Sequence, residues 1–298
     1  MKKIIIQSIL FLVCIGLNAQ TKISFQPSPK SKYHYRQTVT QTIKQTYMGQ
    51  EIPMEQEIST GYDMDISGVQ NNSVQAQFVY KFIEYLVSTP MFTIEYHSEK
   101  QPENPTAQDV MIRKLFQTLI DKPFDMVISA DGTVESVTGM DQIMDEMILA
   151  VSADGLDVKQ MAESIKQQYS DVAIKNNFEQ SLKIYPDQPV KAGDSWEKSH
   201  QIQISGMNAK TISFYTLKEI KKKKAYIDVR SDIELVPGPG VEGTISGTQA
   251  GTIEIDIKSG IPLSSGITQN LSGTITVSGI PVSMEILSQV NSTTTKRK

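Results

Sequence analysis

The sequence has few of the residues from which most chemical sites are built. It contains one cysteine, Cys14, one tryptophan and three histidines among 298 residues. Because Cys14 lies close to the N-terminus, a chain that loses this segment keeps no thiol, which excludes disulfides, thiolate catalysis, iron–sulfur clusters and cysteine-ligated zinc. Stability must then come from a packed core, and a chain of this length can bury about three quarters of its unfolded surface.

Long apolar runs are also missing, apart from one at the start of the chain. The run from Ile4 to Leu17 follows two lysines and ends in the small-residue sequence NAQ. It is shorter than the roughly 20 residues that a membrane helix needs, and the order of its parts is that of a signal peptide. We expect residues 1–19 to be removed after Ala19, and the mature chain to be exported to the periplasm or to the cell exterior.

Basic charge is scarce as well. The chain has 29 basic and 33 acidic residues and a net charge of −4, and loss of the two N-terminal lysines makes it more acidic. Nucleic acid is therefore not expected as a partner. The one basic run, Lys221 to Lys224, separates two strand-like segments and is interpreted as a solvated hairpin tip.

Alternating apolar residues predict strands on both sides of the middle third. Such residues recur at every second position from Val74 to Phe82, from Ala225 to Leu235 with Ser231 as the one polar member, and from Ile253 to Ile257. This spacing places one face of each strand on a core. Turn residues lie between apolar runs at Asp131-Gly132 and at Ser259-Gly260, which is typical of antiparallel hairpins.

The middle third changes to helical spacing. Thr106 followed by Asp109 resembles a capping box and predicts a helix over 107–121 that ends before Pro123. Further helical patterns lie at 143–151, at 157–169 and around Phe178 and Leu182. The helices are therefore expected to come from one continuous part of the chain.

Together these patterns predict an α+β fold. We expect a large curved antiparallel sheet of about 11 to 12 strands, with three to four helices from the central third packed on one face. Residues 20–298 are expected to form a single β-rich domain. The alternative is two β-rich halves, 21–138 and 185–298, bridged by helices over 139–184.

The stretch VKAGDSWEKS places Ser195 in a context close to the G-D-S-L opening of an esterase family. A serine nucleophile needs a base within hydrogen-bond reach and a third group that orients the base. His200, the last histidine, would lie about 16 Å away along a strand and on its opposite face. We therefore predict no catalytic residue and interpret 189–193 as a turn, in which Asp194 and Ser195 bond backbone amides and Trp196 buries its indole.

Glu95, His97 and Glu99 alternate along FTIEYHSE and form the best candidate for a metal site. The opposite face of this strand is expected to be buried, because it carries Phe92, Ile94 and Tyr96. The charged set is then what a solvated face should look like. No metal and no cofactor is predicted.

Methionine is abundant, with 13 residues, and Met140, Met144 and Met147 share one helical pattern. Thioethers line adaptable hydrophobic surfaces such as lipid grooves, although ordinary core filling is the simpler interpretation. A wide curved sheet can enclose more volume than its own side chains fill. The predicted ligand-binding residues are Met144, Met147, Ile148, Phe78 and Phe82.

Three functions of different classes stay open. The favoured one is an exported, non-catalytic envelope protein that binds a lipid or an acylated protein between sheet and helices. The alternative is a structural or interaction protein that contacts another envelope protein, with a filled core and a large exposed apolar patch. The third is a hydrolase, which would require a cleft that holds titratable residues with perturbed pKa values.

Four segments of the sequence form a further pattern: LNAQ at the end of the signal sequence, ISADGTVESVTGMDQI, YPDQPVKAGDSW and GTIEIDIKSGIPLSS. Together they resemble a family of secreted proteins of unknown function from Bacteroidetes-type bacteria. The resemblance covers most of the mature chain and implies the compartment and a β-rich fold, without an activity. The order of strands, helices and strands also looks like that of periplasmic lipoprotein carriers, whose curved sheet and helical lid enclose an acyl chain, but function does not follow from such a likeness.

Overall fold

The protein is built on one antiparallel sheet of twelve strands. The computed structural model describes residues 20–103, 105–152, 159–204, 207–238, 241–277 and 279–297, so the predicted signal peptide lies outside the described residues. The strand order is β6-β5-β3-β2-β1-β12-β11-β10-β9-β8-β7, and β4 pairs with β3 beside this path. The strands are β1 (Lys32–Tyr47), β2 (Gln50–Gln70), β3 (Ser73–Ser88), β4 (Thr93–His97), β5 (Pro123–Ser129), β6 (Val134–Thr138), β7 (Ser195–Ile204), β8 (Met207–Lys221), β9 (Lys224–Pro237), β10 (Val241–Asp256), β11 (Pro262–Val277) and β12 (Ile280–Arg297).

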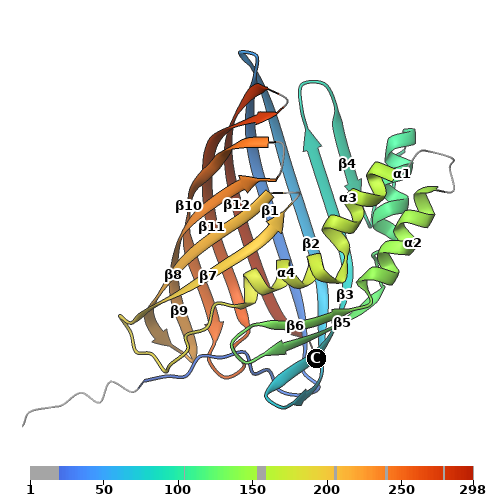
Figure 1. Cartoon of the computed structure of the whole chain (residues 1–298). Coiled ribbons are helices and arrows are strands. Elements are labelled where there is room, and N and C mark those ends of the chain that lie inside the picture. The colour runs from blue at the N-terminus through green and yellow to red at the C-terminus, as the bar shows by residue number, and fades with distance from the viewer. Residues whose placement is uncertain are drawn as a thin grey trace, which may run out of the picture.

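The helices of the described chain come from its central third and lie on one side of the sheet (Figure 1). They are α1 (Ala107–Gln117), α2 (Met140–Ser152), α3 (Lys159–Tyr169) and α4 (Asp171–Leu182). The predicted capping box is confirmed: the Thr106 hydroxyl accepts from the Asp109 amide (3.2 Å), and the Asp109 carboxylate accepts from the Thr106 amide (2.8 Å). Helix α1 ends before residue 121 because the chain turns there to meet β3, where the Asp121 amide donates to the Tyr80 carbonyl.

This architecture confirms the predicted α+β fold, a large antiparallel sheet with helices from the middle of the chain. Whether the chain forms one domain or two stays a prediction. The predicted hairpin tip between β8 and β9 is also confirmed. Lys222 and Lys223 connect these strands with positive φ angles of 50° and 66°, as a two-residue turn of the hairpin type requires.

Strands β10 and β11 approach each other closely at two glycines where the sheet curves. Gly247 and Gly251 lie on the inner face of β10, where a Cβ would come within 1.9 Å of the Asn270 carbonyl oxygen and 2.0 Å of the Gly266 carbonyl oxygen on β11. No other residue fits at such a distance. Glycines at these points let β10 and β11 bend together, which is how sheets acquire tight curvature.

A bulge in β3 changes which face its side chains occupy. Tyr62 of β2 pairs with Tyr80, whereas the neighbouring Gly61 pairs with Phe82, so Lys81 is an extra residue in β3. The prediction that Val74 to Phe82 share one face is therefore wrong at Phe82. Its ring lies over Gly61 on the outer face, where a Cβ on Gly61 would approach Phe82 within 2.1 Å.

The inner face of the sheet carries a row of polar side chains, most of which are hydrogen-bonded to a neighbour in the row. This inner polar row runs in register across β8, β9, β10, β11, β12 and β1, and consists of Ser213, Ser231, Gln249, Gln269, Ser288 and Gln41. Ser231 shares a hydrogen bond with Ser213 (2.8 Å) and accepts one from Gln249 (3.0 Å). A smaller hydrophobic cluster, separate from the main core, includes Ile233 and Leu271 in the adjacent layer of the same face. Satisfied polar groups between apolar layers favour one strand register over its alternatives.

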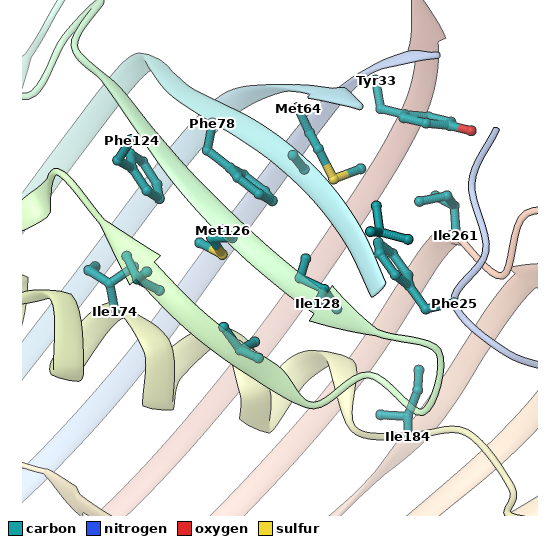
Figure 2. Packing of buried hydrophobic residues seen from close by; sticks show 14 of the residues in the cluster. Phe25, Tyr33, Met64, Phe78, Phe124, Met126, Ile128, Ile174, Ile184 and Ile261 are labelled. Atoms are coloured by element: carbon teal, nitrogen blue, oxygen red, sulfur yellow. The ribbon is translucent and has the colours of Figure 1, made fainter. Parts of the chain in front are cut away.

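The segment from residue 20 to residue 31 closes one end of the curved sheet. The Phe25 amide donates to the Ala130 carbonyl in the β5–β6 turn, and the Gln26 amide donates to the Ser259 carbonyl in the β10–β11 turn, both at 2.8 Å. Phe25 is 1% exposed, and Figure 2 shows its ring close to Ile261. The two predicted turns, far apart in sequence, are thereby tied to the same short segment.

Candidate functional site

A cavity of about 330 Å³ lies between the inner face of the sheet and helix α4. Its walls come from β1, β2, β3, the start of β11, β12, α4, the N-terminal segment and the β10–β11 turn. The described lining residues are Phe25, Tyr35, Gln37, Thr60, Tyr62, Met64, Phe78, Tyr80, Ile174, Asn177, Phe178, Ser181, Leu182, Ile261, Pro262 and Thr294. Strands that are distant in sequence thus share one concave site.

Helix α4 lines the cavity on the side opposite the sheet, and it lies between the two edge strands β6 and β7 (Figure 1). On the β6 side, the Glu179 carboxylate accepts a hydrogen bond from the Val134 amide (3.3 Å) and pairs with Lys183 (3.4 Å). On the β7 side, His200 lies beside Glu179 and Lys183 at the C-terminal end of the helix. The helix is thus anchored to β6 and lies against β7 at its other flank.

The His200 ring is buried, with 9% of its surface exposed, and its Nε2 atom has no partner among the described residues. Burial lowers the pKa of His200, and the positive charges of Lys183 and Lys198 act in the same direction. The nearby Glu179 and the bond to the Lys183 backbone oppose this shift. The ring is therefore held neutral at pH 7 beside the end of the covering helix.

Aromatic rings form the base of the cavity and the contact with the helix. Phe178 of α4 approaches Phe78 at 5.3 Å and Tyr62 at 5.4 Å between ring centroids. Phe78 also stacks on Phe124 of β5 at 5.6 Å. Figure 2 shows Phe78, Phe124 and Ile174 within the same cluster. Such edge-to-face and offset contacts add to the energy of area burial.

Three tyrosines from adjacent strands, Tyr35, Tyr62 and Tyr80, line the cavity. Tyr62 stacks on Tyr35 at 4.6 Å and meets Tyr80 edge-on at 6.0 Å. Burial raises the pKa of Tyr62 well above its usual value and that of Tyr80 to about 12. Both phenols therefore keep their protons and can donate hydrogen bonds at neutral pH.

Only Phe78 of the five residues predicted to bind a ligand is among the described lining residues of this cavity. Met144 and Met147 are buried in the main core, with 7% and 0% exposed surface, and Ile148 packs against that core. Phe82 lies on the outer face beneath the Arg36 guanidinium, 4.6 Å from the ring centroid. The methionines on α2 fill space next to other helices and strands, as in the simpler of the two interpretations of their spacing.

Sequence reasoning missed the tyrosines and Phe178 as site residues. Tyr80 lay within a predicted strand and Phe178 on the weakest of the helical patterns. The sequence therefore predicted the strand and the helix that carry these residues, but not that the residues meet. The missing information was tertiary, because nothing local shows that α4 crosses the concave face opposite β1, β2 and β3.

Ser195 begins β7, as expected, and its surroundings are those of a residue at the start of a strand. Its hydroxyl shares a hydrogen bond with the Thr216 hydroxyl of β8 (2.8 Å) and does not bond a backbone amide, contrary to expectation. Asp194 does accept from a backbone amide, that of Lys191 (2.9 Å), as predicted. Trp196 is only partly buried; its indole donates to the Ile184 carbonyl (2.8 Å) and stacks on Tyr215.

The alternating charged set around β4 is not assembled as one site. His97 pairs with Glu84 of β3 (3.2 Å), and Glu99 lies beyond the end of the strand. Of the opposite face, Tyr96 is buried but Phe92 is 45% exposed, contrary to expectation. Within the described residues, no group of three or more histidine, cysteine, aspartate or glutamate side chains is placed to hold a metal ion. Nor is any helix in this part of the chain long and apolar enough to cross a membrane.

Comparison with models of protein families shows the family to which the chain belongs. A model described as a family of unknown function, DUF6263, matches residues 71–262, well over half of the sequence. The chain belongs to this family. The matched segment begins at the end of β2 and runs through the helices to the β10–β11 turn, so it includes α4 and part of the cavity lining. No curated protein matches the sequence.

Solved structures show distant likenesses in shape. A structure titled for lipid–protein interactions in lipovitellin has 12% identity and a TM-score of 0.47, and the match covers 88% of this chain and 25% of that one. The OccK7 (OpdD) structure from Pseudomonas aeruginosa has 6% identity and a TM-score of 0.25, with 90% and 100% covered. A DUF1329 family protein from Desulfovibrio piger has 9% identity and a TM-score of 0.16, with 89% and 84% covered. The chain thus spans about a quarter of the lipovitellin chain, and no functional argument rests on scores this low.

Proposed function

We propose that the protein is an exported, non-catalytic envelope protein that binds an apolar ligand, a lipid or the acyl group of a partner protein, between the curved sheet and α4. The cavity supports this proposal. Its volume of about 330 Å³ falls within the roughly 300–1,000 Å³ of small-molecule sites, which are concave, mostly apolar and carry few polar groups. Export is proposed from the sequence of residues 1–19 alone.

The covering helix also offers an entrance. Asn177 and Ser181 are one turn apart on α4, and both line the cavity while remaining exposed to solvent. A ligand that enters beside these two side chains would reach the Phe178 ring and then the aromatic base. The helix would not need to leave the sheet completely for this to happen.

Blocking this entrance tests the proposal. The chain from residue 20 onward, purified without detergent, should bind the uncharged fluorescent probe phenylnaphthylamine saturably. Ser181→Trp places a large ring at the entrance and should weaken probe binding by at least about tenfold. Val172→Trp is the matched control, because Val172 is 67% exposed on the same helix and lies outside the lining. Equal probe affinity in the Ser181→Trp and unmodified chains, or no binding to either, would refute the proposal.

A second candidate function is contact with another envelope protein. Apolar side chains at two hairpin tips favour it: Met48 after β1 is 75% exposed, and Met91 and Phe92 between β3 and β4 are 78% and 45% exposed. Met91 and Phe92 are neighbours in one of these tips, and contiguous exposed apolar groups are a common mark of interaction surfaces. Met48→Ser with Met91→Ser should remove such contact and leave probe binding unchanged, as cross-linking in the envelope and probe titration would show.

A further inference from the structure

The described lining of the cavity carries no formal charge. Its residues include no aspartate, glutamate, lysine, arginine or histidine. The polar groups are the side chains of Gln37, Thr60, Asn177, Ser181 and Thr294, together with the three phenols. A carboxylate or a phosphate seated among them would lack a cationic partner, and an unpaired buried charge is strongly disfavoured.

Two hydrogen-bond donors of the lining are nevertheless unused within the described part of the chain. They are the hydroxyls of Tyr62 and Tyr80, which bond no described residue, whereas the Gln37 amide donates to the Tyr35 oxygen (3.1 Å). Both phenols remain protonated at neutral pH, as their raised pKa values require. Each can therefore donate to an oxygen of a ligand.

We propose that the ligand is an uncharged amphiphile, a long-chain acyl ester or alcohol, whose oxygen accepts hydrogen bonds from Tyr62 and Tyr80. Its apolar chain lies against Phe78, Phe178 and Ile174, which line the same cavity. This inference rests on the proposed function and adds the chemical class of the ligand. Free fatty acids, which carry a carboxylate at the end of the acyl chain, and phospholipids, which carry a charged phosphate headgroup, are disfavoured.

Competition among probes that share one chain length tests the ligand class. Lauryl alcohol, methyl laurate and laurate, the last fully ionised at neutral pH, are titrated against bound phenylnaphthylamine. The alcohol and the ester should displace the probe at concentrations at least about tenfold lower than laurate. Laurate that displaces the probe as well as the ester does would overturn the inference while the binding function stands. If the probe itself does not bind, the proposed function fails and the inference fails with it.

The role of the phenols is tested separately from general apolar partitioning. In a Tyr62→Phe and Tyr80→Phe double variant, affinity for methyl laurate should fall by about tenfold or more, while affinity for dodecane, which has no oxygen, should not change. Tyr85→Phe is the matched control, since Tyr85 of β3 packs against Phe116 and is not a lining residue. Equal losses for ester and hydrocarbon would mean that the phenols only fill space, and would contradict the inference.

Native mass spectrometry of the purified protein distinguishes two sources of an uncharged acyl ligand, a free lipid and an acylated partner protein. A free neutral lipid adds a small mass that solvent extraction removes. An acyl ester on a partner protein adds the mass of a polypeptide. Either result supports the uncharged class, whereas a bound fatty acid or phospholipid would overturn it.

Discussion

The ring of Phe178 on α4 meets the ring of Phe78 on β3 at a centroid distance of 5.3 Å and an interplanar angle of 70°. This edge-to-face contact joins the covering helix to the concave face of the sheet, at the cavity that both residues line. The helix is thus held over the cavity by aromatic packing as well as by the Glu179 hydrogen bond to β6. It follows that changes to these contacts should affect ligand binding and stability together.

Truncation of Phe178 should show this coupling. Phe178→Ala removes a partly buried ring and should lower the free energy of unfolding by about 2–3 kcal/mol, because the ring contacts are lost and the cavity widens. Affinity for the apolar probe should fall as well. Val172→Ala, an exposed change on the same helix, should alter neither quantity measurably. Urea denaturation and probe titration of the two variants provide the comparison, and an unchanged probe affinity in Phe178→Ala would contradict the account.

The Glu179 bond to the edge strand should control local opening of the helix. Glu179→Ala leaves the Val134 amide without its acceptor and should cost about 1 kcal/mol. Hydrogen exchange at Val134 should become faster, and probe dissociation should accelerate. Glu146→Ala is the control, because Glu146 of α2 forms its ion pair with Lys122 and not with a residue of α4. Equal exchange protection of Val134 in both variants would show that Glu179 does not anchor the helix.

The lowered pKa of His200 makes stability depend on pH. The unfolded chain binds a proton on this residue near pH 6.5, whereas the folded chain resists it. The contribution of His200 to stability is therefore fully present above about pH 6.5 and is lost as the pH falls toward the lower folded pKa. His200→Gln should make the free energy of unfolding less dependent on pH between about 5 and 7. Urea midpoints measured across this range test it, and parallel pH profiles for variant and parent would contradict it.

Two glycines with similar φ angles should differ sharply in how well they tolerate substitution by alanine. Gly132 (φ 86°) lies in the β5–β6 turn, where a Cβ would come within 1.9 Å of the Leu182 carbonyl oxygen at the end of α4. Gly193 (φ 92°) has nothing within 4 Å. Gly132→Ala should cost more than about 3 kcal/mol, whereas Gly193→Ala should cost only the backbone strain of about 1–2 kcal/mol. Similar thermal midpoints for the two variants would mean that the turn does not fit tightly against the helix.

Sequence patterns were sufficient for the class of fold and for some of its elements. Alternation and turn residues located β3, β5, β6, β9 and part of β10, and the Thr106 capping box located the first helix. The long strands β1, β2 and β12 were not located individually. The bulge at Lys81 could not be predicted, because it depends on pairing with Gly61 and Tyr62 of another strand. It reversed the face of Phe82, which the alternation had placed with Phe78.

The site was harder to predict than the fold, for a physical reason. Its residues come from β1, β2, β3, the start of β11, β12, α4 and two loops, and only the curvature of the sheet brings them together. The Asp131-Gly132 turn was predicted from its residues, yet the fit of Gly132 against α4 was not visible in them. Methionine spacing drew attention to α2, whereas the cavity lies under α4, whose helical pattern was the weakest.

Solvent extraction and mass spectrometry of the mature protein, purified from its native compartment without detergent, test the central claim most directly. The account predicts a co-purified uncharged lipid in near-stoichiometric amount, which the Phe178→Ala variant retains poorly. A protein that carries no lipid and does not take up methyl laurate when it is supplied would contradict ligand binding in this cavity.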